Sequence, residues 1–142
     1  MHLREELSHQ FDYERWANMR WLKPAAELGC SPIMIHILQA QIIWLSRIEG
    51  RPAWTPTLEN FVADLDRSVR SWQRLMLSAD LNQVVHYTTS RGDEFDNTVG
   101  EIARHVLNHG TYHRGELRGR AGAAGLESFE ETDYILFCRE HK

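Results

Sequence analysis

Six apolar residues between positions 58 and 76 repeat at alternating intervals of four and three residues. They are Leu58, Val62, Leu65, Val69, Trp72 and Met76. Residues at these spacings lie along one side of an α-helix, and such a stripe is buried only when other helices cover it. The pattern therefore predicts a helix in this region and a fold in which helices pack on helices.

The N-terminal region shows a similar stripe. Its members, at helical spacings, are Leu3, Leu7, Phe11, Asn18 and Leu22. They predict an amphipathic helix over residues 3–27. Pro24 should kink this helix or start a new turn, because proline cannot donate a backbone hydrogen bond.

A second helix is predicted over residues 32–49. Ser31 suits the N-cap, Pro32 suits the first helical position, and Gly50 ends the pattern. The predicted buried face comprises Ile33, Ile37, Ala40, Trp44 and Ile48.

Residues 84–97 change in character, because β-branched residues and tyrosine surround a turn at Gly92. This composition predicts a small hairpin. The last long helix should start at Asp96 or Asn97, both good caps, and run to the glycines of residues 119–125.

Composition and charge limit the function classes. The 142 residues, 42% of them hydrophobic, suit a single domain over residues 1–142, and the apolar tail at 134–138 should pack on it. A net charge of −4 without a basic stripe disfavours nucleic acid. Without an apolar run of 18 residues or a signal-like N-terminus, we expect a cytoplasmic protein that is not inserted in a membrane. Cys30 and Cys138 have no metal or redox spacing.

Three histidines lie on successive turns of the last predicted helix: His105, His109 and His113. Neighbours four residues apart can share an ion at about 2.0–2.1 Å from each nitrogen, whereas His105 and His113 lie about 12 Å apart along the axis. The core-facing stripe selects two of them. It contains Val99, Ile102, Val106, His109, His113 and Glu116. Buried histidines can instead be hydrogen-bonded core residues, but desolvating three polar side chains favours a bound cation.

A third ligand should come from a facing helix, as in other bundle metal sites. His36 is the best candidate, because it lies at the edge of the apolar face of residues 32–49. The set His36, His109 and His113 would bind a divalent ion and leave a coordination position open, and imidazole suits zinc, nickel, copper and iron alike.

Several other side chains could have either of two roles. Trp16, Trp44 and Trp72 should pack in the core, although one could line a pocket above the metal. Arg114 could link helices through Asn18 or a backbone carbonyl, or bind an anionic substrate.

Four segments carry a resemblance to a known family. They are FDYERWAN, HILQAQIIWLSRIEG, TSRGDEF and NHGTYHRGEL. Together they resemble the DinB-like family of four-helix metalloproteins, related to the YfiT-like proteins and distinct from the DNA polymerase of the same name. The likeness covers nearly the whole chain.

The resemblance implies an all-α, up-down-down-up four-helix bundle that is commonly a homodimer. It also implies a nickel, zinc or similar ion held by one histidine of the second helix and two of the last, here His36, His109 and His113. The apolar tail with outward-facing Trp21 and Trp54 would supply the dimer contact. The sequence departs from the family at Gln41, often Glu, at Glu116, often Gln, and in a shorter first connection.

The resemblance favours activation of a low-molecular-weight thiol for transfer to a small electrophilic substrate. Glu116 would then be a catalytic side chain, accepting a proton or a hydrogen bond, unless it faces outward and pairs with Arg120. Two alternatives stay open. One is metal-dependent hydrolysis through an ionised water. The other is a non-catalytic, stress- or damage-responsive metal-binding module.

Overall fold

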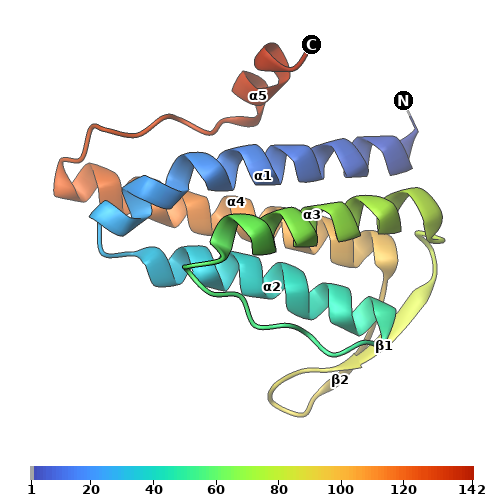
Figure 1. The fold of residues 1–142 in the computed structure, drawn as a ribbon. Coiled ribbons are helices and arrows are strands. Elements are labelled where there is room, and N and C mark those ends of the chain that lie inside the picture. Colours follow the sequence, from blue (N-terminus) through green and yellow to red (C-terminus); the bar gives the residue numbers. More distant parts are fainter. Residues whose placement is uncertain (1) are drawn as a thin grey trace.

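The computed structural model describes residues 2–142 and is mostly helical (Figure 1). In chain order the elements are α1 (Leu3–Glu27), α2 (Ser31–Glu49), α3 (Phe61–Ser78), β1 (Val84–Thr88), β2 (Glu94–Thr98), α4 (Val99–Ala124) and α5 (Tyr134–Glu140). α1 and α4 run in one direction and α2 and α3 in the other (Figure 1). The expected helical fold is confirmed as a mostly helical one. It includes a two-stranded antiparallel sheet, where the sequence predicted a small hairpin, and a short fifth helix that the sequence did not predict. None of the helices in residues 2–142 is long and apolar enough to cross a membrane.

The ends of the helices follow local signals. α1 has the predicted bounds and continues through Pro24. α2 has Pro32 in its first turn and ends at Gly50, whose φ of 67° is easily adopted by glycine. Its N-cap is Cys30 rather than the predicted Ser31.

The start of α4 differs from the prediction. Asp96 and Asn97 belong to β2, and the N-cap is Thr98, which forms a capping box with Glu101. Each of these two side chains binds the backbone N–H of the other, so two otherwise unpaired donors are satisfied. The preceding hairpin has the predicted turn, with Gly92 at φ 86°.

The apolar stripe predicted for α3 is confirmed at its last four positions. Leu65, Val69, Trp72 and Met76 are buried. Leu58 lies before α3 and is exposed, and Val62 is also exposed. The buried stripe therefore starts later than the spacing predicted. On α2 the buried face is also rotated from the predicted one. It consists of Met34, Ile37, Leu38, Gln41, Ile42 and Leu45.

Trp21 and Trp54 differ in burial. Trp21 was expected to face outward, but it is 1% exposed and its Nε1 donates to the Thr132 hydroxyl at 3.1 Å. Trp54 is half-buried beneath the Arg67 guanidinium. Trp21 therefore cannot belong to a dimer contact, and the homodimer itself stays a prediction.

The C-terminal segment leaves the end of α4 and runs back along α1 to α5 (Figure 1). Phe137 of α5 is buried in a small cluster with Tyr13 and Ala17. The Tyr13 hydroxyl also donates to the Thr132 carbonyl. The tail therefore packs on the body, as its apolar composition predicted.

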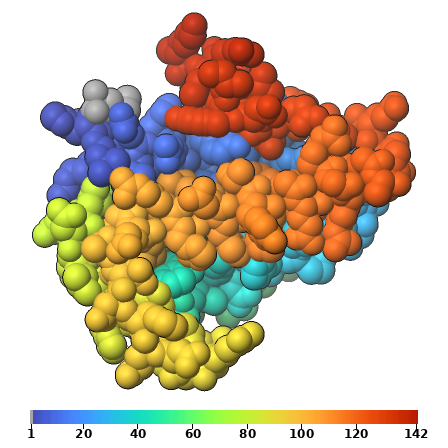
Figure 2. All heavy atoms as spheres, turned by 180° about the vertical axis from the view of Figure 1, so that it is seen from behind, coloured from blue at the N-terminus to red at the C-terminus, as the bar shows by residue number. Residues whose placement is uncertain are grey.

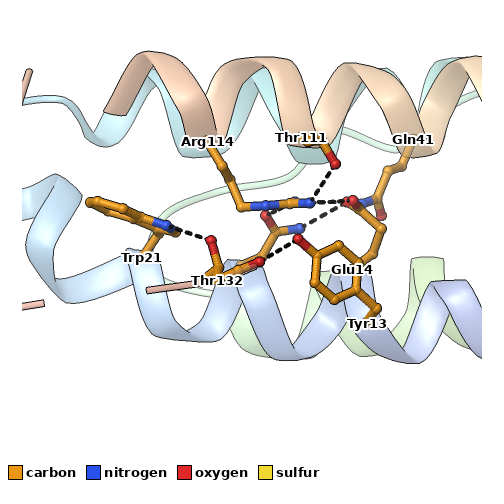
Figure 3. Close-up of polar contacts among 8 residues, drawn as sticks. Tyr13, Glu14, Trp21, Gln41, Thr111, Arg114 and Thr132 are labelled. Atoms are coloured by element: carbon orange, nitrogen blue, oxygen red, sulfur yellow. Dashed lines mark hydrogen bonds and ion pairs between the residues drawn. The ribbon is translucent and has the colours of Figure 1, made fainter. Parts of the chain in front are cut away.

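A charged pair lies at the centre of the bundle. Arg114 of α4 is 3% exposed and forms two hydrogen bonds with the Glu14 carboxylate of α1, at 2.6 and 3.1 Å. The same guanidinium donates to Asn18 at 2.9 Å and to Thr111 at 3.2 Å. Figure 3 shows Arg114 reaching from α4 between Thr111 and Glu14. Paired hydrogen bonds of this kind fix orientation as well as distance.

The network continues into α2 and α3. The Gln41 side-chain amide donates to Glu14 at 3.4 Å, and its carbonyl accepts from Ser68 at 2.8 Å. The Trp72 indole donates to the backbone carbonyl of Gln41 at 3.1 Å. All four long helices therefore meet in one buried polar network.

Gly110 makes room for the charged pair. A Cβ at this position would lie 2.4 Å from one Glu14 oxygen and 2.7 Å from the other. Any larger residue would displace the carboxylate from Arg114. The position of the Glu14 carboxylate beside α4 therefore requires glycine here.

Glu14→Gln should lower the free energy of unfolding by about 3–5 kcal/mol, because Arg114 would remain buried without its counter-charge. Urea unfolding monitored by circular dichroism measures the change. Glu131→Gln is the matched control, since its pair with Arg118 is exposed and contributes less than about 1 kcal/mol. Similar losses in the two variants would contradict a central role for the buried pair.

Candidate metal centre

Three imidazoles from two helices meet at the seam between α2 and α4. Each of His36, His109 and His113 offers one nitrogen, and these three atoms lie within 4.8 Å of one another. The Nε2 atoms of His36 and His109 are 3.1 Å apart. Two ligand nitrogens on one tetrahedral ion would be separated by about 3.3 Å. The donor set therefore fits a divalent cation of the borderline type that imidazole prefers.

The site lies at the border of the core rather than inside it. His36 is exposed, and His109 and His113 are half-buried. The buried stripe of α4 was predicted to pass through the two histidines and Glu116, but it passes instead through Gly110, Arg114 and Leu117. The convergence of the nitrogens, not their full desolvation, is thus the feature that makes the cluster compatible with metal binding.

His105 stands outside the cluster, as expected from its distance along the helix. Its ring lies 5.8 Å from that of His109 and packs edge-on against Trp44 at 5.3 Å. Trp44 is half-buried rather than part of the core. His105 therefore flanks the cluster without joining it.

A lowered pKa keeps the His109 ring neutral, which is the form of imidazole that binds metals. Burial, with further contributions from the neighbouring His113, His36 and His105, lowers the pKa of His109 to about 4. Burial and then His113 also lower the pKa of His36, against an opposing effect of Glu116. Both rings are therefore neutral near pH 7, as coordination requires.

Comparison with known proteins places the chain in a family. The DinB family profile matches residues 29–139. The chain belongs to the DinB family. It is similar to Protein DinB of Bacillus subtilis (strain 168), with 36% identity over 161 aligned positions that cover 89% of this chain and 90% of that protein. No solved structure matches it.

The region matched to the DinB family contains all three clustered histidines and Glu116. The match begins after Glu14, which the sequence reasoning did not single out. A signal was available, because Glu14 lies three residues after Phe11 and four before Asn18, on the stripe of α1. A carboxylate on an otherwise apolar stripe requires a buried partner, and that partner is Arg114.

Glu116 contacts one member of the cluster. One oxygen lies 3.0 Å from His113 Nδ1, and the other accepts from Arg120 at 3.2 Å. These two hydrogen bonds lower the pKa of Glu116. A carboxylate on Nδ1 fixes the tautomer with Nε2 unprotonated, so that Nε2 is free to coordinate. The two roles considered for Glu116, contact with the site and pairing with Arg120, therefore coexist.

In the metal-free protein, the C2 proton of His109 should titrate near pH 4 in NMR spectra. His86 is the comparison, because its hydrogen bond to Asp96 raises its pKa above the ordinary 6.5. Between about pH 6.5 and 4 the unfolded chain binds a proton at His109 that the folded chain does not, so stability should fall as the pH falls through this range. Equal midpoints for His86 and His109 would contradict the burial of His109.

Proposed function

We propose that this DinB-family chain is a metal-dependent enzyme that activates a small thiol for transfer to an electrophile. The observation that supports the proposal is the convergence of three imidazole nitrogens at a solvent-accessible helix seam. We assign the ligand role to His36, His109 and His113, with zinc or nickel as the expected ion. Three neutral imidazoles leave coordination positions open, which is the arrangement of catalytic rather than closed structural sites.

The reaction is a nucleophilic displacement. A divalent ion at the cluster would supply positive charge that favours thiolate over thiol near neutral pH. The thiol proton leaves to solvent, the sulfur electron pair forms a bond to the electrophilic carbon, and the leaving group departs with its own electron pair. The exposed position of His36 keeps the cluster accessible to both reactants.

Glu116 is proposed to act by positioning His113 rather than as the proton acceptor. Its carboxylate is already hydrogen-bonded to His113 and Arg120, and both contacts lower its pKa and make it a weaker base. The residue thus differs from a general base, whose pKa should lie near the working pH.

His113→Ala should remove the metal and abolish thiol-dependent turnover, while the melting temperature of the metal-free protein changes little. The bundle is held by its apolar seams and by the buried network, neither of which includes His113. Elemental analysis, a thiol-transfer assay and thermal unfolding measure the three quantities.

His9→Ala is the control for His113→Ala, since His9 lies on α1 outside the cluster. His105→Ala should reduce metal content much less than His113→Ala. Turnover without an added thiol would favour hydrolysis instead. A sharp fall in melting temperature on metal removal, in a protein without activity, would favour a metal-binding module.

Glu116→Ala should weaken zinc binding about 10–100-fold, because His113 would lose the partner that fixes its tautomer and ring orientation. Glu116→Gln keeps a carbonyl acceptor and should lose less. Calorimetric titration of the metal-free proteins with zinc measures both constants. An affinity unchanged in Glu116→Ala would exclude the positioning role.

A further inference from the structure

We propose that an aromatic recess beside the histidine cluster binds a planar, uncharged aromatic group of the electrophilic substrate. The recess has a volume of about 250 Å³. It is lined by Trp44, Tyr87, Asn97, Glu101, Ile102 and His105. The proposal rests on the proposed function, which it extends by naming a substrate class.

Three rings from three elements form its walls. Trp44 of α2 and Tyr87 of β1 meet edge to face, with centroids 4.8 Å apart and planes at 77°. His105 of α4 meets the Trp44 ring at 5.3 Å and 73°. Aromatic rings bind other rings through such edge and offset contacts. The walls therefore match a flat aromatic group better than a branched aliphatic one.

Polar and cationic neighbours hold the walls in place. The Tyr87 hydroxyl donates to Asn97 Oδ1 at 2.6 Å. The Arg47 guanidinium lies over Trp44 at 4.5 Å and near Tyr87 at 5.2 Å, but Arg47 does not line the recess. A rigid, preformed wall reduces the ordering cost of binding.

The recess adjoins the cluster through His105. This residue precedes His109 by one helical turn, and their ring centroids are 5.8 Å apart. Figure 2 shows α4 in orange along this face, with teal α2 below it and the yellow hairpin beside them. A ring held against Trp44 and His105 would place its substituents toward the three histidines. His105, which is not one of the three clustered histidines, would therefore contact the substrate.

Size and charge narrow the ligand class. A cavity of about 150 Å³ accommodates benzene, so this recess has room for one substituted ring. A cation is disfavoured, because Arg47 already occupies the cation–π position on Trp44 and Tyr87. An anion is disfavoured by the Glu101 carboxylate, which lines the recess. A neutral ring remains.

Nitrobenzene, titrated into the zinc-loaded protein and followed by the methyl signals of Ile102, which also lines the recess, tests the recess directly in NMR spectra. Trp44→Leu should weaken binding about tenfold, as expected for the loss of an aromatic contact. Trp16→Leu is the matched control, a half-buried tryptophan of α1 that does not line the recess. Tyr87→Leu provides a second variant should Trp44→Leu fold poorly, and zinc titration checks that the cluster is intact in each.

Turnover supplies an independent measurement. The ratio of thiol transfer to 1-chloro-2,4-dinitrobenzene over transfer to iodoacetamide should fall about tenfold in Trp44→Leu. Nitrobenzene binding that is lost in Trp44→Leu, in a protein without transfer activity, would support the recess and refute the proposed function. Unchanged binding and an unchanged ratio would overturn the recess, as would tighter binding of phenyltrimethylammonium than of nitrobenzene.

Discussion

The buried pair between Glu14 and Arg114 sets the rotation of α4 about its own axis. Because Arg114 forms two hydrogen bonds with one carboxylate, only a narrow range of orientations satisfies it. Successive residues of an α-helix are rotated by about 100°, so directing Arg114 at α1 turns its neighbour His113 toward α2. One turn earlier, Gly110 faces α1 and its neighbour His109 is likewise turned toward α2. The polar pair in the core thus determines where the histidines at its edge lie.

The same carboxylate also explains why Gln41 is suited to its position. Gln41 is 1% exposed, donates to Glu14 and accepts from Ser68. A glutamate there would put a second carboxylate beside Glu14 without another cation, which is costly in a buried site. The neutral amide supplies a donor and an acceptor at once. It ties α2 to the network five residues after His36, so both helices that carry the cluster are fixed by one carboxylate.

Local patterns determined how much could be predicted from the sequence. The bounds of α1 and the hairpin followed from apolar spacing and turn residues, and His109 and His113 were paired because they lie one turn apart. The rotation of α4 about its axis could not be predicted in this way, since neither Gly110 nor Arg114 has an apolar side chain that would mark a buried face. Arg114 is buried only because Glu14, a hundred residues away in the chain, neutralises it. Periodicity detects a stripe of residue types, whereas this contact depends on tertiary packing.

The two faces of α4 have different surroundings. One packs in the core, and the other carries the clustered histidines. The buried face meets α1 through Gly110 and Arg114, and the polar atoms of Arg114 are paired inside the protein apart from its Nε. The other face carries the histidines at the border with solvent, where water can satisfy unbound nitrogens at little cost. Because the cluster is not part of the core, an ion is not needed to complete the core. An ion bound at this border would therefore contribute little to the stability of the bundle.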